Sequence, residues 1–137
     1  MSKFEGWLLK FGDTILPNRF FAYDEGWEIT PRQRTELEGY RDDYTQKLYR
    51  ITSEGLKTKI EAKLPAMSNE KFVEFLSFIN KGLENELQRK YRITYWDPET
   101  QEYETGSFYQ PDTKYSPVYV REKIILYKKI AFTLIEY

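Results

Sequence analysis

The most constraining feature of this chain is a change of hydrophobic period near its middle. From Leu56 to Leu64 apolar and polar residues alternate strictly, which predicts a strand with one buried and one solvated face. After Ser68, a good N-cap residue, apolar side chains recur at helical spacing. They are Phe72, Phe75, Leu76, Ile79 and Leu83. Two adjacent stripes of different period predict a helix over about 68–83, packed on the strand that precedes it.

The rest of the chain carries mostly strand signals. Turn residues separate short apolar runs, and a Gly-Asp or Asp-Pro pair between two runs favours a hairpin. The expected strands or paired strands cover 7–16, 20–23, 27–30, 47–52, 91–96, 102–109, 118–120, 124–127 and 130–135. The helix either ends near Gly82 or Asn85 or continues through residues 84–90. The last apolar run, 130–135, is either a central strand or an edge strand that joins subunits. We predict one domain over 1–137, with about eight or nine strands. Its class is α+β, mainly β: an antiparallel β-sandwich or small barrel flanked by one main helix.

Composition excludes several classes of function. The chain has 137 residues with neither cysteine nor histidine, which excludes Ser-His and Cys-His catalysis and thiolate metal sites. Its net charge is −1, far from the basic field of a dedicated nucleic-acid binder. No Gly-rich phosphate loop and no apolar run of about 18 residues occurs. We therefore expect no enzyme, no cofactor, no metal and no membrane span.

Residues 31–46 form a long polar segment with charges of both signs. We predict a loop or a protruding hairpin here, with a short helix over 31–38 as the alternative. Long connections of this kind are often functional. Its two tyrosines, Tyr40 and Tyr44, are candidate contact residues that would become ordered against a neighbouring molecule.

Acidic residues gather in and beside one predicted hairpin turn. They are Asp97, Glu99, Glu102 and Glu104. Two carboxylates can act together as a glycosidase pair, but a solvated turn explains them better. The spacing also lacks the glycine and distal glutamate of a calcium loop.

Residues 64–137 carry motifs in an order that resembles small tail proteins of long-tailed phages and prophages of Gram-positive bacteria. The motifs are Ser68, Tyr91–Tyr95, Asp97–Pro98, Thr105–Tyr109, Asp112, Tyr115–Pro117 and Phe132–Glu136. The resemblance implies a tail-tube-like fold and a subunit that assembles into a ring, usually hexameric, around a DNA channel.

From this resemblance we expect a structural subunit of the tail tube or distal tail hub, made in the host bacterial cytoplasm and located in the virion tail. Its partners would be further copies of itself, neighbouring tail proteins and DNA that passes without sequence-specific binding. Candidate interface residues are Tyr40, Tyr44, Tyr109, Tyr115 and Tyr119, and the acidic cluster is the candidate lining of a lumen. The alternatives are a monomeric ligand- or host-protein-binding module and a carboxylate-dependent hydrolase.

Overall fold

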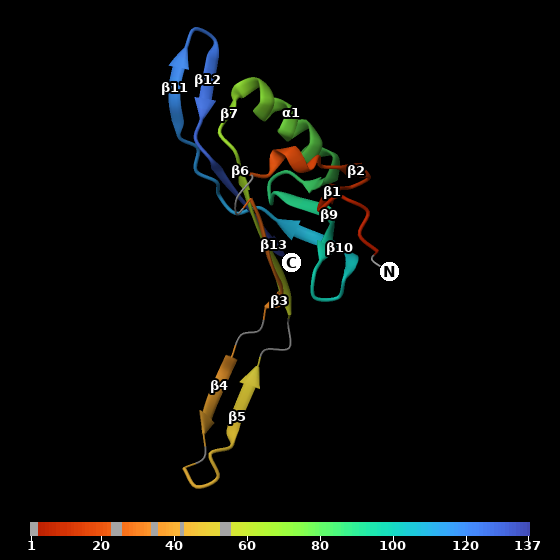
Figure 1. Ribbon diagram of the computed structural model, residues 1–137, viewed down its shortest axis with the longest axis vertical. Helices are drawn as coiled ribbons and strands as arrows, with labels where there is room; N and C mark the ends of the chain where they lie inside the picture. Colours follow the sequence, from red (N-terminus) through yellow and green to blue (C-terminus); the bar gives the residue numbers. More distant parts are fainter. Residues whose placement is uncertain (1–2, 23–25, 34–35, 42, 53–55) are drawn as a thin grey trace.

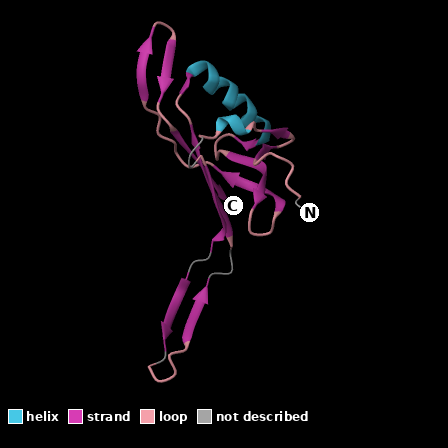
Figure 2. Cartoon of the chain, in the orientation of Figure 1, coloured by secondary structure: helices cyan, strands magenta, loops and turns pink. Residues whose placement is uncertain are grey.

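The computed structural model describes the chain except residues 1–2, 23–25, 34–35, 42 and 53–55 (Figure 1). Thirteen strands, one α-helix and two short 3₁₀ turns lie in the described part (Figure 2). Their bounds, in chain order, are β1 Leu9–Phe11, β2 Thr14–Ile15, η1 Asn18–Phe20, β3 Trp27–Gln33, β4 Glu36–Arg41, β5 Leu48–Thr52, β6 Lys57–Leu64, β7 Met67–Ser68, α1 Asn69–Ile79, η2 Asn80–Gly82, β8 Leu83–Asn85, β9 Lys90–Asp97, β10 Glu102–Tyr109, β11 Pro117–Arg121, β12 Ile124–Tyr127 and β13 Ile130–Glu136. The predicted class, α+β and mainly β, is confirmed, although the chain breaks into more strands than we expected.

One antiparallel sheet of eight strands forms the body. Its strands follow the order β2-β1-β9-β10-β13-β6-β3, with β8 paired to β9. Strands β10 and β13 pair through only two residue pairs, Phe108 with Glu136 and Tyr109 with Ile135. The sheet bends at this narrow junction, and its two halves pack face to face. The Phe11 and Phe132 rings meet across the interior at 6.4 Å.

The predicted alternation of β6 is confirmed. Thr58, Ile60, Ala62 and Leu64 are buried, and the residues between them are half-buried or exposed. The core also takes in Phe11, Ile93, Phe108, Phe132 and Leu134 from the facing strands. Strand β13 lies between β10 and β6, so it is an interior strand and not an edge that joins subunits.

The predicted helix stripe is confirmed as core. Phe75 and Ile79 are buried, and Phe72, Leu76 and Phe78 pack against them. The helix itself ends at Ile79, and residues 83–85 form β8, so a helical extension over 84–90 is wrong. The chain passes close to the backbone of β9 at this point and requires glycine, because a Cβ on Gly82 would stand 2.6 Å from the Arg92 carbonyl oxygen.

Strand β3 continues through Pro31, where we expected it to end. The register with β6 shifts between Thr30 and Gln33, so Pro31 and Arg32 lie in an irregularity of the ladder. Proline has no N–H to donate and would interrupt a regular ladder, but an irregular position requires no donor and tolerates it. Arg32 has a positive φ of 44°, and its backbone N–H donates to Thr58 Oγ1 at 3.1 Å.

Two hairpins extend from the body in opposite directions (Figure 1). Strands β4 and β5 pair only with each other in the described chain, from Glu36 with Thr52 to Arg41 with Leu48. This hairpin, here called the long arm, occupies the segment for which a loop, a hairpin and a short helix were the alternatives, and its described residues are not helical. The second hairpin, β11–β12, is joined to β7 beside the helix and is here called the basic arm.

Candidate functional site

The turn between β9 and β10 contains a buried carboxylate, contrary to our expectation. Asp97 is 0% exposed. Its side chain accepts hydrogen bonds from Arg32 Nη1 at 2.5 Å and from the backbone N–H of Glu99 at 2.9 Å. Arg32 also pairs with Glu99 at 3.2 Å. Asp97 is buried because these donors replace its water, and it therefore cannot line a lumen.

The other three acidic residues lie nearer to the solvent. The Glu99 and Glu102 side chains are about half exposed, and Glu102 pairs with Lys3 at 2.5 Å. Glu104 is half-buried on β10. Glu99 and Glu102 each pair with a cationic side chain, which favours a charged surface over a carboxylate pair arranged for hydrolysis.

Four aromatic side chains lie beside this turn. The Trp7 and Tyr103 rings stack at 4.1 Å, and Trp96 meets Tyr103 at 5.1 Å and Phe4 at 5.1 Å. The Tyr103 hydroxyl donates to the Trp7 carbonyl at 2.8 Å, and the Glu5 backbone N–H donates to that hydroxyl at 2.9 Å. The N-terminal segment 3–7 is thus fixed across the β9–β10 hairpin. We call these rings, with Glu5, Glu99 and Glu102, the aromatic–acidic face.

The basic arm exposes apolar side chains on both of its strands. Val118, Tyr119, Val120 and Ile124 have exposed fractions between 45% and 65%, and every residue of β11 is exposed. Residues 114–129 contain five basic side chains and one acidic one. Only Arg121 and Lys123 of these basic residues lie within the hairpin, where they accompany Glu122. The arm therefore combines exposed apolar side chains with a small net positive charge, and it includes Tyr119, one of the predicted interface residues.

The other predicted interface tyrosines have different surroundings. Tyr44, at the end of the long arm, is 97% exposed, whereas the side chain of Tyr40 lies outside the part of the chain that is described. Tyr109 is half-buried and meets the Tyr137 ring at 5.5 Å. Tyr115 is 45% exposed and leans on Phe72 at 5.5 Å. Of the four interface tyrosines whose side chains are described, Tyr44 and Tyr119 are thus the two that are more than half exposed.

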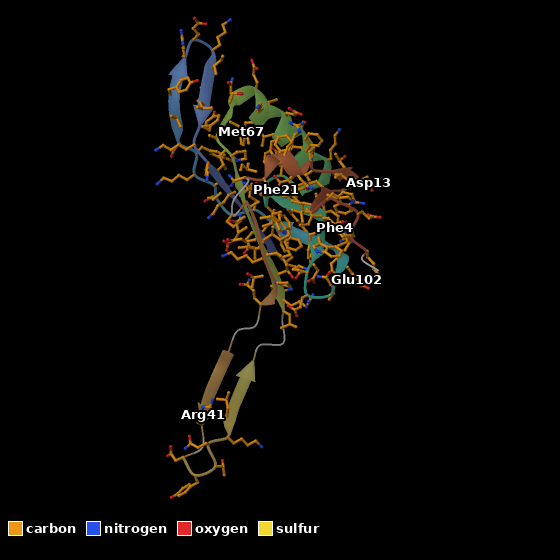
Figure 3. All side chains as sticks on the ribbon, in the orientation of Figure 1. Phe4, Asp13, Phe21, Arg41, Met67 and Glu102 are labelled. Carbon is orange, nitrogen blue, oxygen red and sulfur yellow. The ribbon has the colours of Figure 1, made fainter. Side chains whose placement is uncertain are left out.

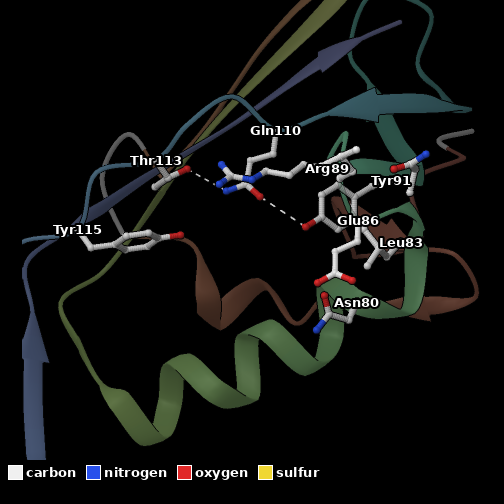
Figure 4. A pocket seen from close by; sticks show the side chains of 10 residues that line it. Asn80, Leu83, Glu86, Arg89, Tyr91, Gln110, Thr113 and Tyr115 are labelled. Carbon is white, nitrogen blue, oxygen red and sulfur yellow. Dashed lines mark hydrogen bonds between the residues drawn. The ribbon is translucent and has the colours of Figure 1, made fainter.

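An open groove of about 1240 Å³ lies between the end of the helix and the 110–115 segment. Asn80, Leu83 and Glu86 line one side of it and Tyr115 the other (Figure 4). The Tyr91 hydroxyl donates to Gln110 Oε1 at 3.5 Å, and Gln110 Nε2 donates to Thr113 Oγ1 at 2.8 Å. These buried polar groups bond to one another, so their arrangement supports the wall of the groove.

Comparison with protein-family models identifies a family to which the chain is similar over its length. The model described as "Family of unknown function (DUF6711)" matches residues 1–137. The chain belongs to the DUF6711 family. No curated protein and no solved structure matches it. Membership in DUF6711 therefore supplies no activity, and the function has to be inferred from the residues and the surfaces themselves.

The described part of this DUF6711 member has neither a grouping of metal-binding side chains nor a membrane-spanning helix. Among its described residues, no three or more acidic side chains are grouped so that they could hold a metal ion. No helix in the same part of the chain is both long and apolar enough to span a membrane.

Alkaline pH should destabilise this DUF6711 member through two core tyrosines. Burial raises the pKa of Tyr91 and of Tyr95 above the ordinary value of 10.0. The folded state holds these protons more tightly than the unfolded state. The two tyrosines therefore make their full contribution to the free energy of unfolding below about pH 10, and this contribution is lost as the pH rises through their folded pKa. Tyrosinate absorbance, followed together with circular dichroism, should show a step of tyrosine ionisation that coincides with the loss of structure. Ionisation of all tyrosines in one step, with the fold intact, would contradict this expectation.

Proposed function

We propose that this chain is a structural subunit of a phage tail or tail-like particle, and that it assembles with further copies of itself into a ring of the tail tube or distal hub. The function lies in shape and in complementary surfaces. A body with two oppositely directed hairpin arms supports this proposal, because arms of this kind can reach neighbouring subunits (Figure 1).

The single observation that carries the proposal is the exposure of apolar side chains along the basic arm. Val118, Tyr119, Val120 and Ile124 are all at least 45% exposed. By the register of the hairpin, Tyr119 and Ile124 lie on one of its faces and Val120 on the other. Exposed apolar side chains gathered on one element favour a contact site. Burial of apolar area stabilises a contact by about 25 cal/mol per Å². An edge strand with no charged residue among its first four positions is also prone to pair with another chain, and β11 has its one charge at Arg121.

The resemblance of residues 64–137 supports the choice of particle. Its Asp97–Pro98 motif lies at the β9–β10 turn and its Phe132–Glu136 motif lies in β13, the interior strand. Closed rotational symmetry is the usual arrangement by which a repeated head-to-tail contact avoids open-ended growth. A ring is therefore the assembly that we propose.

The proposal is tested on the particle and on the purified chain. Mass spectrometry of tails purified from the phage or prophage that carries the gene should detect this chain, and gold-labelled antibody should bind the tail in electron micrographs. The purified full chain should form rings under negative stain. Absence of the chain from purified tails would overturn the proposal.

A further inference from the structure

We propose that a β-bulge held by the buried Arg32–Asp97 ion pair fixes the direction in which the long arm leaves the body. The inference concerns a single copy of the chain and goes beyond the proposed assembly, whose success or failure does not affect it. It gives Arg32 and Asp97 a second role, as positioning residues for the arm.

The bulge lies where β3 approaches the long arm. Two residues of β3, Pro31 and Arg32, lie opposite a single residue of β6, Thr58. A bulge bends its strand and increases the local twist, so it changes the direction of the chain that follows. The first strand of the arm, β4, begins at Glu36, four residues after Arg32. The bulge is therefore in position to aim the arm.

Arg32 has a backbone conformation that residues other than glycine rarely adopt. Its φ of 44° lies in the left-handed region. Such a conformation persists where the surrounding contacts determine it. Here the Arg32 backbone N–H donates to Thr58 Oγ1 at 3.1 Å, and the guanidinium donates to Asp97 Oδ2 at 2.5 Å. The first bond holds the bulge to β6, and the second holds it to the β9–β10 turn.

The strand opposite the bulge is held by further hydrogen bonds. Thr58 is 1% exposed, and its backbone N–H donates to Glu136 Oε1 at 3.0 Å. The neighbouring Lys57 Nζ donates to the Tyr137 carbonyl oxygen. The two strands that lead into the arm, β3 and β6, are thus bonded to the β9–β10 turn and to the end of the chain. Figure 1 shows the β9–β10 turn on the side of the body from which the long arm extends.

The ion pair favours one direction of the arm more than it adds stability. The attraction between two buried charges roughly offsets the cost of removing them from water, whereas a buried charge left without its partner is strongly unfavourable. Asp97 is 0% exposed, and Arg32 reaches Asp97 and Glu99 together, at 2.5 Å and 3.2 Å. An arm that left the body in another direction would withdraw Arg32 from both carboxylates. The pair therefore selects one direction over the others.

Spin labels on the full chain measure this direction. The chain has no cysteine, so Asp13→Cys in the β1–β2 turn and Asp43→Cys at the end of the long arm provide two exposed labelling sites. Asp13 lies on the body, and the arm residue Arg41 precedes Asp43 by two positions (Figure 3). Double electron–electron resonance, with the labelled chain diluted in unlabelled chain, gives distances within one copy. The labelled parent should show a single narrow distribution.

The substitution Arg32→Met with Asp97→Asn removes both charges at once. Asparagine can still accept the Glu99 N–H of the turn, and no buried charge is left unpaired, so this double variant should fold with a urea midpoint close to that of the labelled parent. The width of its distance distribution should nevertheless increase by about twofold or more, because the bulge loses a contact that determines its conformation. Asp97→Asn alone, which leaves Arg32 with Glu99, should give an intermediate width.

Phe75→Ala is the control for a general loss of stability, because Phe75 packs between the helix and β13. Its distance distribution should be as narrow as that of the labelled parent. Unchanged widths in the double variant and in Asp97→Asn would overturn the inference, as would an equal increase in Phe75→Ala. A broad distribution in the labelled parent would also overturn it, because the arm would then have no fixed direction.

Discussion

The substitution Phe75→Ala is expected to lower the free energy of unfolding by about 3 to 5 kcal/mol. Phe75 is 1% exposed, and its ring meets the Phe20 and Phe132 rings, each at 5.5 Å. It therefore joins the helix to the N-terminal 3₁₀ turn and to the central strand β13. Truncation removes the apolar burial and enlarges a cavity of about 50 Å³ that already lies beside the ring.

Urea denaturation with an unchanged slope would measure this loss. Val73→Ala on the same helix is the matched control, because Val73 is 65% exposed and its truncation should change stability by less than about 0.5 kcal/mol. A loss below about 1 kcal/mol for Phe75→Ala would mean that the helix is not fixed to the sheet through this side chain.

The parts of the fold that could be predicted from the sequence are those whose periodicity is set by burial on one face. The buried faces of strand β6 and of the helix can be read from the sequence. Apolar residues recur at every second position in β6 and at helical spacing in the helix, because each element packs one face on the same core. The β9–β10 hairpin could be predicted as well, since Asp97–Pro98 specifies a turn between two alternating runs. These features depend on residues that are close together in the sequence.

Features that depend on distant residues could not be predicted in this way. The partner of Asp97 is Arg32, 65 positions earlier, within a segment interpreted as polar and irregular. The aromatic–acidic face joins Phe4 and Trp7 to Trp96 and Tyr103, which no local pattern connects. Nothing in residues 118–127 distinguishes the exposed strands of the basic arm from core strands, because an apolar run has the same composition whether the fold or another chain covers it.

The buried ion pair leads to the second large prediction. Asp97→Ala should destabilise the chain by about 2 kcal/mol, because it removes the acceptor of the Glu99 N–H and leaves Glu99 as the carboxylate partner of Arg32. The hydrogen bonds that Arg32 donates to Asp97 and Glu99 raise the pKa of its guanidinium above the ordinary value, so the group stays charged. Arg32 lies at the end of β3, directly before the long arm.

Two matched substitutions separate the contributions. The Glu99 N–H donates to Asp97 at 2.9 Å, and the side-chain oxygen of an asparagine can still accept this hydrogen bond. Asp97→Asn loses only the charge that faces Arg32, so it should lower the free energy of unfolding by less than Asp97→Ala does. Asp112→Ala removes the partner of Arg89, 3.2 Å away, but that carboxylate is fully exposed, and the loss should be below about 1 kcal/mol. The difference between Asp97→Ala and Asp112→Ala should persist at high salt, because salt screens a buried pair much less than an exposed one. If the two alanine variants lost the same free energy of unfolding, burial of Asp97 would not be the reason for its contribution to stability.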